Sequence, residues 1–448
     1  MDTSSRFVLN QSLTKLSFNR KNLGDEKIKL LLDSVKEDVL EELDFQRNLI
    51  GPSGAFFIAE FMKRNSSVKI LDLSFNTLGV EGAKNLSQFA PSNSTITSLN
   101  LSGNTIGSEG LNYMSQFLQQ NSSITYLNLR RNAISAPGME YLSKALSSNA
   151  SLTSLELGVN QIGSKGLKYL LECYHTNVTL SSLSLENNQL DPESSHYFGD
   201  VLQRQPVLRY LNLTVNNLGT DCAVSLSGSL EKNNTLTYLN LEDTQIGTYG
   251  AKLFAESLKR NTTLTSLNLS SNKIDNGAVY PFVDLLKHNT TLLSLDLGRN
   301  SWSNCKQFYS SLLNNHFITT LTLDMNSKHW ALPLLKINED YTTMNKQTSN
   351  WPTSHPLLPP SDQHTIHQFL SNISQYNLPR EIQILLVQAL LSLRNSYHLY
   401  HSKYFLKSFN PHKKTTQPTL ATIQQVKLTQ LKEIYAYWTH NLITRKEK

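Results

Sequence analysis

Hydrophobic and polar positions follow a pattern that recurs about every 28 residues along most of this chain. A leucine that opens a short Leu-x-Leu segment, or Leu-x-Phe in the first two units, returns twelve times, with spacings of 27, then 28 nine times, then 26. Repeats of this length stack on one another, because a single unit cannot bury its apolar face alone. These anchor leucines are Leu16, Leu43, Leu71, Leu99, Leu127, Leu155, Leu183, Leu211, Leu239, Leu267, Leu295 and Leu321.

Each unit predicts a short strand followed by a turn. The two leucines of Leu-x-Leu lie at period 2, so both side chains point into the core. Asn stands five residues after the anchor in ten of the units, and only Lys21 and Thr244 replace it. We expect each buried amide to bind backbone groups where the chain leaves the strand, and successive amides to form a ladder.

The second half of each unit predicts a helix. Glycines such as Gly107 allow the tight turn, and we expect the helix to begin at a second glycine such as Gly110, whose small size lets helices lie close. Leu111, Met114 and Leu118 then follow helical spacing. Strands are packed about 4.8 Å apart, whereas helices need about 8–10 Å. The array must therefore curve, with a parallel sheet on its concave face and helices on its convex face.

The motif L-x-x-L-x-L-x-x-N-x-I-G-x-x-G with a 28-residue period resembles the ribonuclease-inhibitor type of leucine-rich repeat. That type also occurs in NOD-like receptors, in the GTPase-activating protein of Ran and in bacterial proteins injected into host cells. The resemblance implies an α/β fold, a curved leucine-rich-repeat solenoid (horseshoe). It covers about 13–326 and implies no single function, because this fold hosts many partners.

The free positions beside the strand leucines face the concave side and carry the candidate chemistry. They are mostly polar, with a few tyrosines and arginines between them. Tyr and Arg offer large contact areas and directional hydrogen bonds, so they are enriched where proteins bind proteins. The alternative is an ordinary solvated sheet surface with scattered tyrosines. The predicted partner-binding residues are Tyr126, Arg130, Arg131, Glu156, Glu186, Tyr210, Tyr238, Glu242 and Arg299.

Composition and charge indicate the cellular compartment and show where basic residues gather. The 448 residues hold three cysteines, which argues against a disulfide scaffold and allows a reducing compartment. No signal peptide or membrane-spanning stretch is visible, so we expect a cytoplasmic protein, or a translocated one if it is a bacterial effector. The net charge of +6 is uneven: residues 327–448 carry 14 Lys and Arg against 6 Asp and Glu, and the remainder 27 against 29.

The end of the chain departs from the repeat. We expect a solenoid over 1–326, a Pro-containing linker over 327–360 and a small basic α-helical region over 361–448. A basic excess of this kind occurs where proteins contact nucleic acid or anionic lipid, but the favoured interpretation is an ordinary lysine-rich surface. A contact of the basic region with a membrane is left open. Two histidine pairs spaced i,i+3 suggest zinc, but nothing makes the pairs meet, so no metal or cofactor is expected. These are His364 with His367, and His398 with His401.

The sequence favours a non-enzymatic scaffold or recognition protein that binds a protein partner on its concave face. Few cysteines and mixed charge disfavour a ribonuclease inhibitor, and the absence of ATPase motifs disfavours a NOD-like receptor. The near-uniform repeats are rich in Asn, Gln, Lys and Thr, and this composition resembles that of injected bacterial effectors. The alternatives are an enzyme or regulatory protein acting through 361–448, or a GTPase regulator resembling the Ran activator. Nucleic-acid binding is disfavoured, and nothing in the sequence indicates an oligomer.

Overall fold

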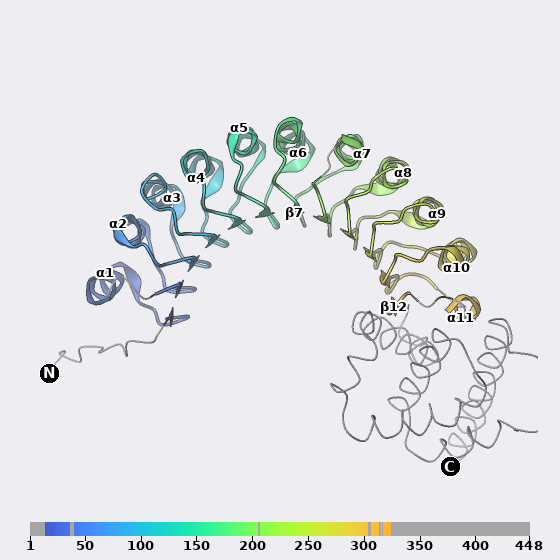
Figure 1. The fold of residues 1–448 in the computed structure, drawn as a ribbon, viewed down its shortest axis with the longest axis horizontal. Coiled ribbons are helices and arrows are strands. Elements are labelled where there is room, and N and C mark those ends of the chain that lie inside the picture. Colours follow the sequence, from blue (N-terminus) through green and yellow to red (C-terminus); the bar gives the residue numbers. More distant parts are fainter. Residues whose placement is uncertain are drawn as a thin grey trace, which may run out of the picture. The chain divides into compact units, whose positions relative to one another are not determined.

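A computed structural model describes residues 14–35, 40–204, 207–302, 306–312, 315 and 317–323. In this part of the chain the strands form the inner side of an arc and the helices its outer side (Figure 1). The expected curved α/β solenoid is therefore confirmed for the repeats. The linker predicted at 327–360, the helices predicted at 361–448 and the histidine pairs lie outside the described residues.

In the described part of the chain, twelve parallel strands form one sheet in sequence order. Each anchor leucine pairs in register with the anchor of the next unit, as Leu127 does with Leu155. The anchors and the leucines two residues later are buried, so the period-2 prediction is confirmed. The strands are β1 (Lys15–Ser17), β2 (Glu42–Asp44), β3 (Ile70–Asp72), β4 (Ser98–Asn100), β5 (Tyr126–Asn128), β6 (Ser154–Glu156), β7 (Ser182–Ser184), β8 (Tyr210–Asn212), β9 (Tyr238–Asn240), β10 (Ser266–Asn268), β11 (Ser294–Asp296) and β12 (Thr320–Thr322).

Helices alternate with the strands and bury the face predicted from helical spacing. Leu111, Met114 and Leu118 are all buried. Three short 3-10 helices accompany them among the described residues. The helices are α1 (Gly24–Ser34), α2 (Pro52–Arg64), α3 (Gly79–Ser87), α4 (Gly107–Gln120), α5 (Ala136–Ser148), α6 (Gly163–Glu172), η1 (Cys173–His175), η2 (Pro192–Ser194), α7 (Ser195–Arg204), α8 (Gly219–Leu230), α9 (Gly247–Leu258), η3 (Asn276–Ala278), α10 (Val279–His288) and α11 (Lys306–Leu312).

The start of the helices corrects one expectation. Helix α4 begins at Gly107, whose φ of 67° lies in the left-handed region that glycine adopts readily, and not at Gly110. Gly110 is instead buried one turn into the helix. A Cβ atom there would lie 3.3 Å from the Ala83 Cβ of the preceding helix. The close approach expected from its size is therefore confirmed, within the helix rather than at its start.

The predicted asparagine ladder is present at the strand exits. The Oδ1 atom of Asn160 accepts hydrogen bonds from the backbone N–H groups of Asn132 (2.9 Å) and Ile134 (3.1 Å) in the preceding unit. Its Nδ2 atom donates to the carbonyls of Leu157 (2.8 Å) and Leu129 (3.1 Å). The amide thus ties two units together through backbone groups that would otherwise be buried without partners.

A second asparagine ladder lies at the helix ends, and the sequence analysis did not identify it. The Nδ2 atom of Asn121 donates to the Asn93 carbonyl (2.8 Å), and its Oδ1 accepts from the Ile124 N–H (3.0 Å). These asparagines belong to the short segments rich in Asn, Ser and Thr that precede the strands. Equivalent buried residues are Asn65, Asn93, Asn149, Asn177, Asn233, Asn261, Asn289 and Asn315.

Candidate functional site

Three rows of side chains cross the concave face. The first row holds the residue before each anchor, the second the residue after it, and the third the residue three positions after it. Over β5–β8 the first row reads Tyr126, Ser154, Ser182, Tyr210; the second reads Asn128, Glu156, Ser184, Asn212; and the third reads Arg130, Gly158, Glu186, Thr214. We call these twelve positions the central patch.

Tyrosines stand at both ends of the first row of the central patch. Tyr210 on β8 stacks on Tyr238 of β9, with ring centroids 4.4 Å apart and ring planes 8° apart. Tyr126 on β5 stands alone, three strand spacings or about 14 Å from Tyr210, and its hydroxyl accepts a hydrogen bond from Asn128 Nδ2 (3.3 Å). The small Ser154 and Ser182 lie between Tyr126 and Tyr210, so each of these two tyrosines has a small side chain as its neighbour on the side that faces the other.

Glu156 lies in the second row between the tyrosines. Burial raises the pKa of its carboxyl, and the Glu186 carboxylate adds to this rise, while a hydrogen bond from the Ser184 hydroxyl and the charge of Arg130 oppose it. Burial also raises the pKa values of Tyr126 and Tyr210, and the negative charge of Glu156 contributes to both shifts. Among the described residues, Glu156 forms no ion pair.

Arg130 and Glu186 form an ion pair across the third row. Gly158 lies between them on the intervening unit, and a Cβ atom there would come within 2.5 Å of Glu186 Cγ. The missing side chain therefore leaves room for Glu186 to reach Arg130. Asn212 Nδ2 also donates to Glu186 Oε2 (3.3 Å), so this carboxylate has partners on both sides.

The other predicted binding residues lie at the edge of the central patch or beyond it. Arg131 is exposed on the turn after β5 and has a φ of 58°. Glu242 and Arg299 form an ion pair with each other, with 3.6 Å between Oε1 and Nη1, at the exits of β9 and β11. In the third row Glu242 is one unit from Thr214, as Tyr238 is one unit from Tyr210 in the first row. Seven of the nine predicted residues therefore lie in or beside one patch, and Arg131 and Arg299 lie outside it.

In the N-terminal part of the concave face, polar side chains of neighbouring units bind one another. Ser17 Oγ donates to Asp44 Oδ2 (2.6 Å), and Asn100 Nδ2 donates to Asp72 Oδ2 (2.9 Å). Lys15 also pairs with Glu42 (2.6 Å). Short polar side chains that are satisfied by their neighbours offer less for a partner to bind than the tyrosines and Glu156 of the central patch.

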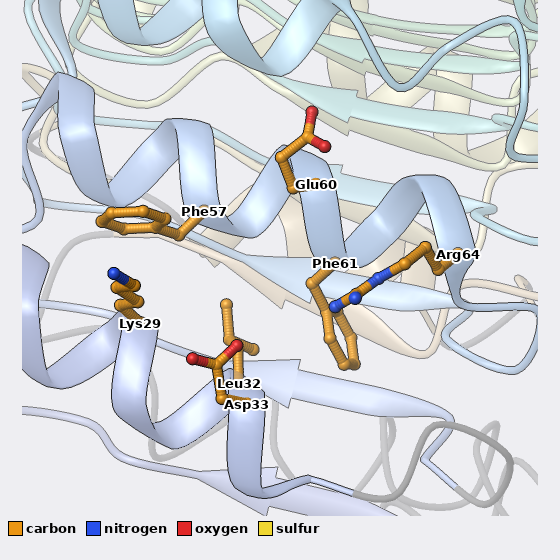
Figure 2. A pocket seen from close by; sticks show the side chains of 7 residues that line it. All are labelled: Lys29, Leu32, Asp33, Phe57, Glu60, Phe61 and Arg64. Carbon is orange, nitrogen blue, oxygen red and sulfur yellow. The ribbon is translucent and has the colours of Figure 1, made fainter.

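A pocket of about 170 Å³ lies on the convex side between α1 and α2 (Figure 2). Its four charged side chains cancel, since Lys29 and Arg64 stand against Asp33 and Glu60. Ligand pockets usually measure about 300–1,000 Å³. The pocket is therefore too small and too evenly charged to be the preferred site.

The two described cysteines are buried and free. Burial raises the pKa of the Cys173 and Cys222 thiols to about 12, so both are protonated at neutral pH. A protonated, enclosed thiol is a poor nucleophile and a poor metal ligand. Within the described ranges no three His, Cys, Asp or Glu side chains gather in a metal-binding group, and no helix is long and apolar enough to cross a bilayer.

A family model described as "Leucine Rich repeat" matches six stretches, which are 64–87, 92–115, 120–143, 148–171, 232–255 and 260–283. Each stretch contains one strand and at least the first part of the helix that follows it, so the matches have the same period as the strands of the sheet. The chain is a leucine-rich repeat protein. Leucine-rich repeat solenoids present long concave surfaces that bind partners. The ribonuclease-inhibitor subclass stays a prediction.

Several solved structures are similar to this leucine-rich repeat protein. The leucine-rich repeat-containing protein LegL7 from Legionella pneumophila is 25% identical over 60% of this chain and 88% of its own, with a TM-score of 0.41. Leiomodin-1 Actin-Binding Site 2 is 24% identical over 31% and 85%, with a TM-score of 0.28. TLR13 in complex with ssRNA13 is 20% identical over 70% and 41%, with a TM-score of 0.40. No curated protein matches the chain.

The sequence analysis of this leucine-rich repeat protein found the charged and aromatic residues of the patch but missed those that arrange them. Gly158 makes room for the ion pair, Ser184 binds Glu156, and Asn212 binds Glu186. Alignment of the repeats was enough to predict that Ser154 and Ser182 lie side by side between two tyrosines in the first row. The pairing of Arg130 with Glu186 was not, because the two residues belong to units that do not adjoin.

Proposed function

We propose that this protein is a non-enzymatic recognition protein whose central patch binds a protein partner. The observation that carries the proposal is the Tyr210–Tyr238 stack beside a half-buried carboxylate without an ion-pair partner among the described residues. Rigid aromatic rings with polar hydroxyls are typical of binding hot spots. Arg130, Glu186 and Tyr126 complete the proposed contact surface, with Arg131, Glu242 and Arg299 as outlying contacts.

The proposed organisation keeps 1–326 as the binding array, 327–360 as a linker and 361–448 as a basic helical region that contacts a membrane or a further partner. We extend the proposal to a bacterial protein that acts inside a host cell, because the repeats are rich in Asn, Gln, Lys and Thr. In that setting the array would capture a host protein, and no catalytic residue or cofactor is required for it to do so.

The test is affinity capture with the full-length protein and two triple variants. One variant replaces Tyr126, Tyr210 and Tyr238 with Ala. The matched control replaces three exposed tyrosines of the convex helices with Ala, namely Tyr141, Tyr249 and Tyr280. A partner bound by the wild type should be retained by the control and lost by the concave variant, since a hot-spot residue contributes about 1–2 kcal/mol or more.

Stability is measured on the same variants. The concave variant should lose more than the control, because the stacked pair of rings contributes about 0.5–1.5 kcal/mol. Circular dichroism must show that both variants remain folded. Full affinity in the folded concave variant would remove the site from the central patch.

A further inference from the structure

The charge of the central patch is not balanced by its own residues. The twelve positions contain one cation, Arg130, and two carboxylates, Glu156 and Glu186. Arg130 pairs with Glu186, so among the described residues the Glu156 carboxylate has the Ser184 hydroxyl as its side-chain hydrogen-bond donor and only the weaker charge effect of Arg130. A half-buried carboxylate gains from a cation more than an exposed one does, because solvent screens it less.

The aromatic surface beside this carboxylate has a free face. Tyr210 uses one ring face to stack on Tyr238 of β9. Its other face is directed along the sheet towards β7, where the first row holds only the small Ser182. A planar cation over Ser182 could therefore lie against this ring face and close to Glu156 and Glu186 together.

We propose that the central patch binds an arginine side chain presented by the partner protein, with its guanidinium against Tyr210 and its N–H groups on Glu156 and Glu186. This inference rests on the proposed function and adds the chemistry of the partner. Arginine fits better than lysine, because the planar guanidinium stacks on an aromatic ring and donates several hydrogen bonds in one plane. One arginine also supplies the one positive charge that the twelve positions lack.

The probe is a display library of random 12-residue peptides selected on the immobilised full-length protein. Arginine should be enriched in the selected peptides over the unselected library. The tightest peptide is then measured by calorimetry against the wild type, with its arginine intact or replaced by citrulline, the neutral isostere. Loss of a charged hydrogen-bonding group should weaken binding about tenfold or more.

The same peptides are measured against Glu156→Gln, which keeps the shape of the side chain and removes its charge. If the guanidinium lies on Glu156, the citrulline penalty should shrink to about threefold or less in this variant. Lys144→Gln on the exposed face of α5 is the matched control and should leave the penalty unchanged. Equal binding of peptides with arginine, lysine and citrulline would overturn the proposal.

Two further outcomes separate this proposal from its rivals. Peptides that lose affinity on Tyr210→Ala but do not depend on arginine would overturn the inference and leave the proposed function standing. Peptides that bind the Tyr126, Tyr210 and Tyr238 triple variant unchanged would overturn both. A synthetic peptide of residues 440–448 tests the chain's own basic end as the occupant: if it binds as tightly and with the same dependence on Glu156, the partner proposal fails.

Discussion

The Arg130 guanidinium forms an ion pair with the Glu186 carboxylate although a complete repeat lies between them. The pair spans β6 because Gly158, in the same row, has no side chain to block it. A second pair, Glu242 with Arg299, also joins units that are two repeats apart. The free positions of the concave face are therefore organised across units as well as between adjacent ones.

Gly158→Ala should break the coupling between Arg130 and Glu186. The new Cβ atom would lie 2.5 Å from Glu186 Cγ, so the carboxylate must move away. An exposed ion pair contributes about 0.2–1 kcal/mol, and Arg130→Ala should cost this in the wild type and nearly nothing in Gly158→Ala. Urea unfolding of the four proteins gives the coupling energy. Gly298→Ala, at another glycine of the same row, is the control, and an undiminished Arg130 effect in Gly158→Ala would contradict the argument.

Asn160→Ala should lower the free energy of unfolding by about 1–3 kcal/mol, because it leaves buried backbone groups of two units without partners. Five hydrogen bonds depend on this amide. Thermal or denaturant unfolding measures the loss. Asn234→Ala, at an exposed position, should cost less than about 0.5 kcal/mol, and equal midpoints for the two variants would disprove a structural role for the strand-exit ladder.

Asn121→Ala should destabilise the array in the same way through the second ladder. Its side chain donates to the Asn93 carbonyl and accepts from the N–H groups of Ser123 and Ile124. We expect a loss of about 1–3 kcal/mol in denaturant unfolding. Ser122→Ala, one residue later and exposed, is the matched control. A loss no larger than that of the control would show that the helix-end amides are dispensable.

Stability should depend on pH through Glu156. Its pKa in the folded protein is raised above the ordinary value of 4.5, mainly by burial, so the folded state holds this proton more tightly than the unfolded chain. The free energy of unfolding therefore decreases as pH rises from 4.5 through the folded pKa. Glu156→Gln should remove this part of the slope. The measurement is the difference in unfolding free energy between the two proteins at several pH values, and a difference that is constant with pH would count against the shift.

Cys173 and Cys222 should resist thiol reagents in the folded protein. Their pKa of about 12 leaves almost no thiolate at pH 8, and both side chains are enclosed. Mass spectrometry after labelling, with peptide mapping to separate them from Cys305, should find both unmodified without denaturant and modified in urea. Rapid native labelling of either would show that its helix opens readily.

The sequence by itself determined the repeat architecture of this protein. An anchor leucine every 28 residues sets the strand register, because each unit can bury its leucines only by lying beside the same leucines of the next unit. The strand-exit asparagines were also predictable, since a turn out of a buried strand leaves backbone groups that an amide can bind. In both cases the requirement arises within one unit and is repeated by the next.

The tertiary structure alone decided what the free positions form. The repeat places Tyr210 beside Tyr238, but only the side-chain conformations stack the two rings. It places Arg130 and Glu186 two units apart, and only the space over Gly158 lets them meet. Periodicity fixes where Cα atoms lie, whereas contacts between long side chains depend on their conformations and on the volume that neighbouring side chains leave open.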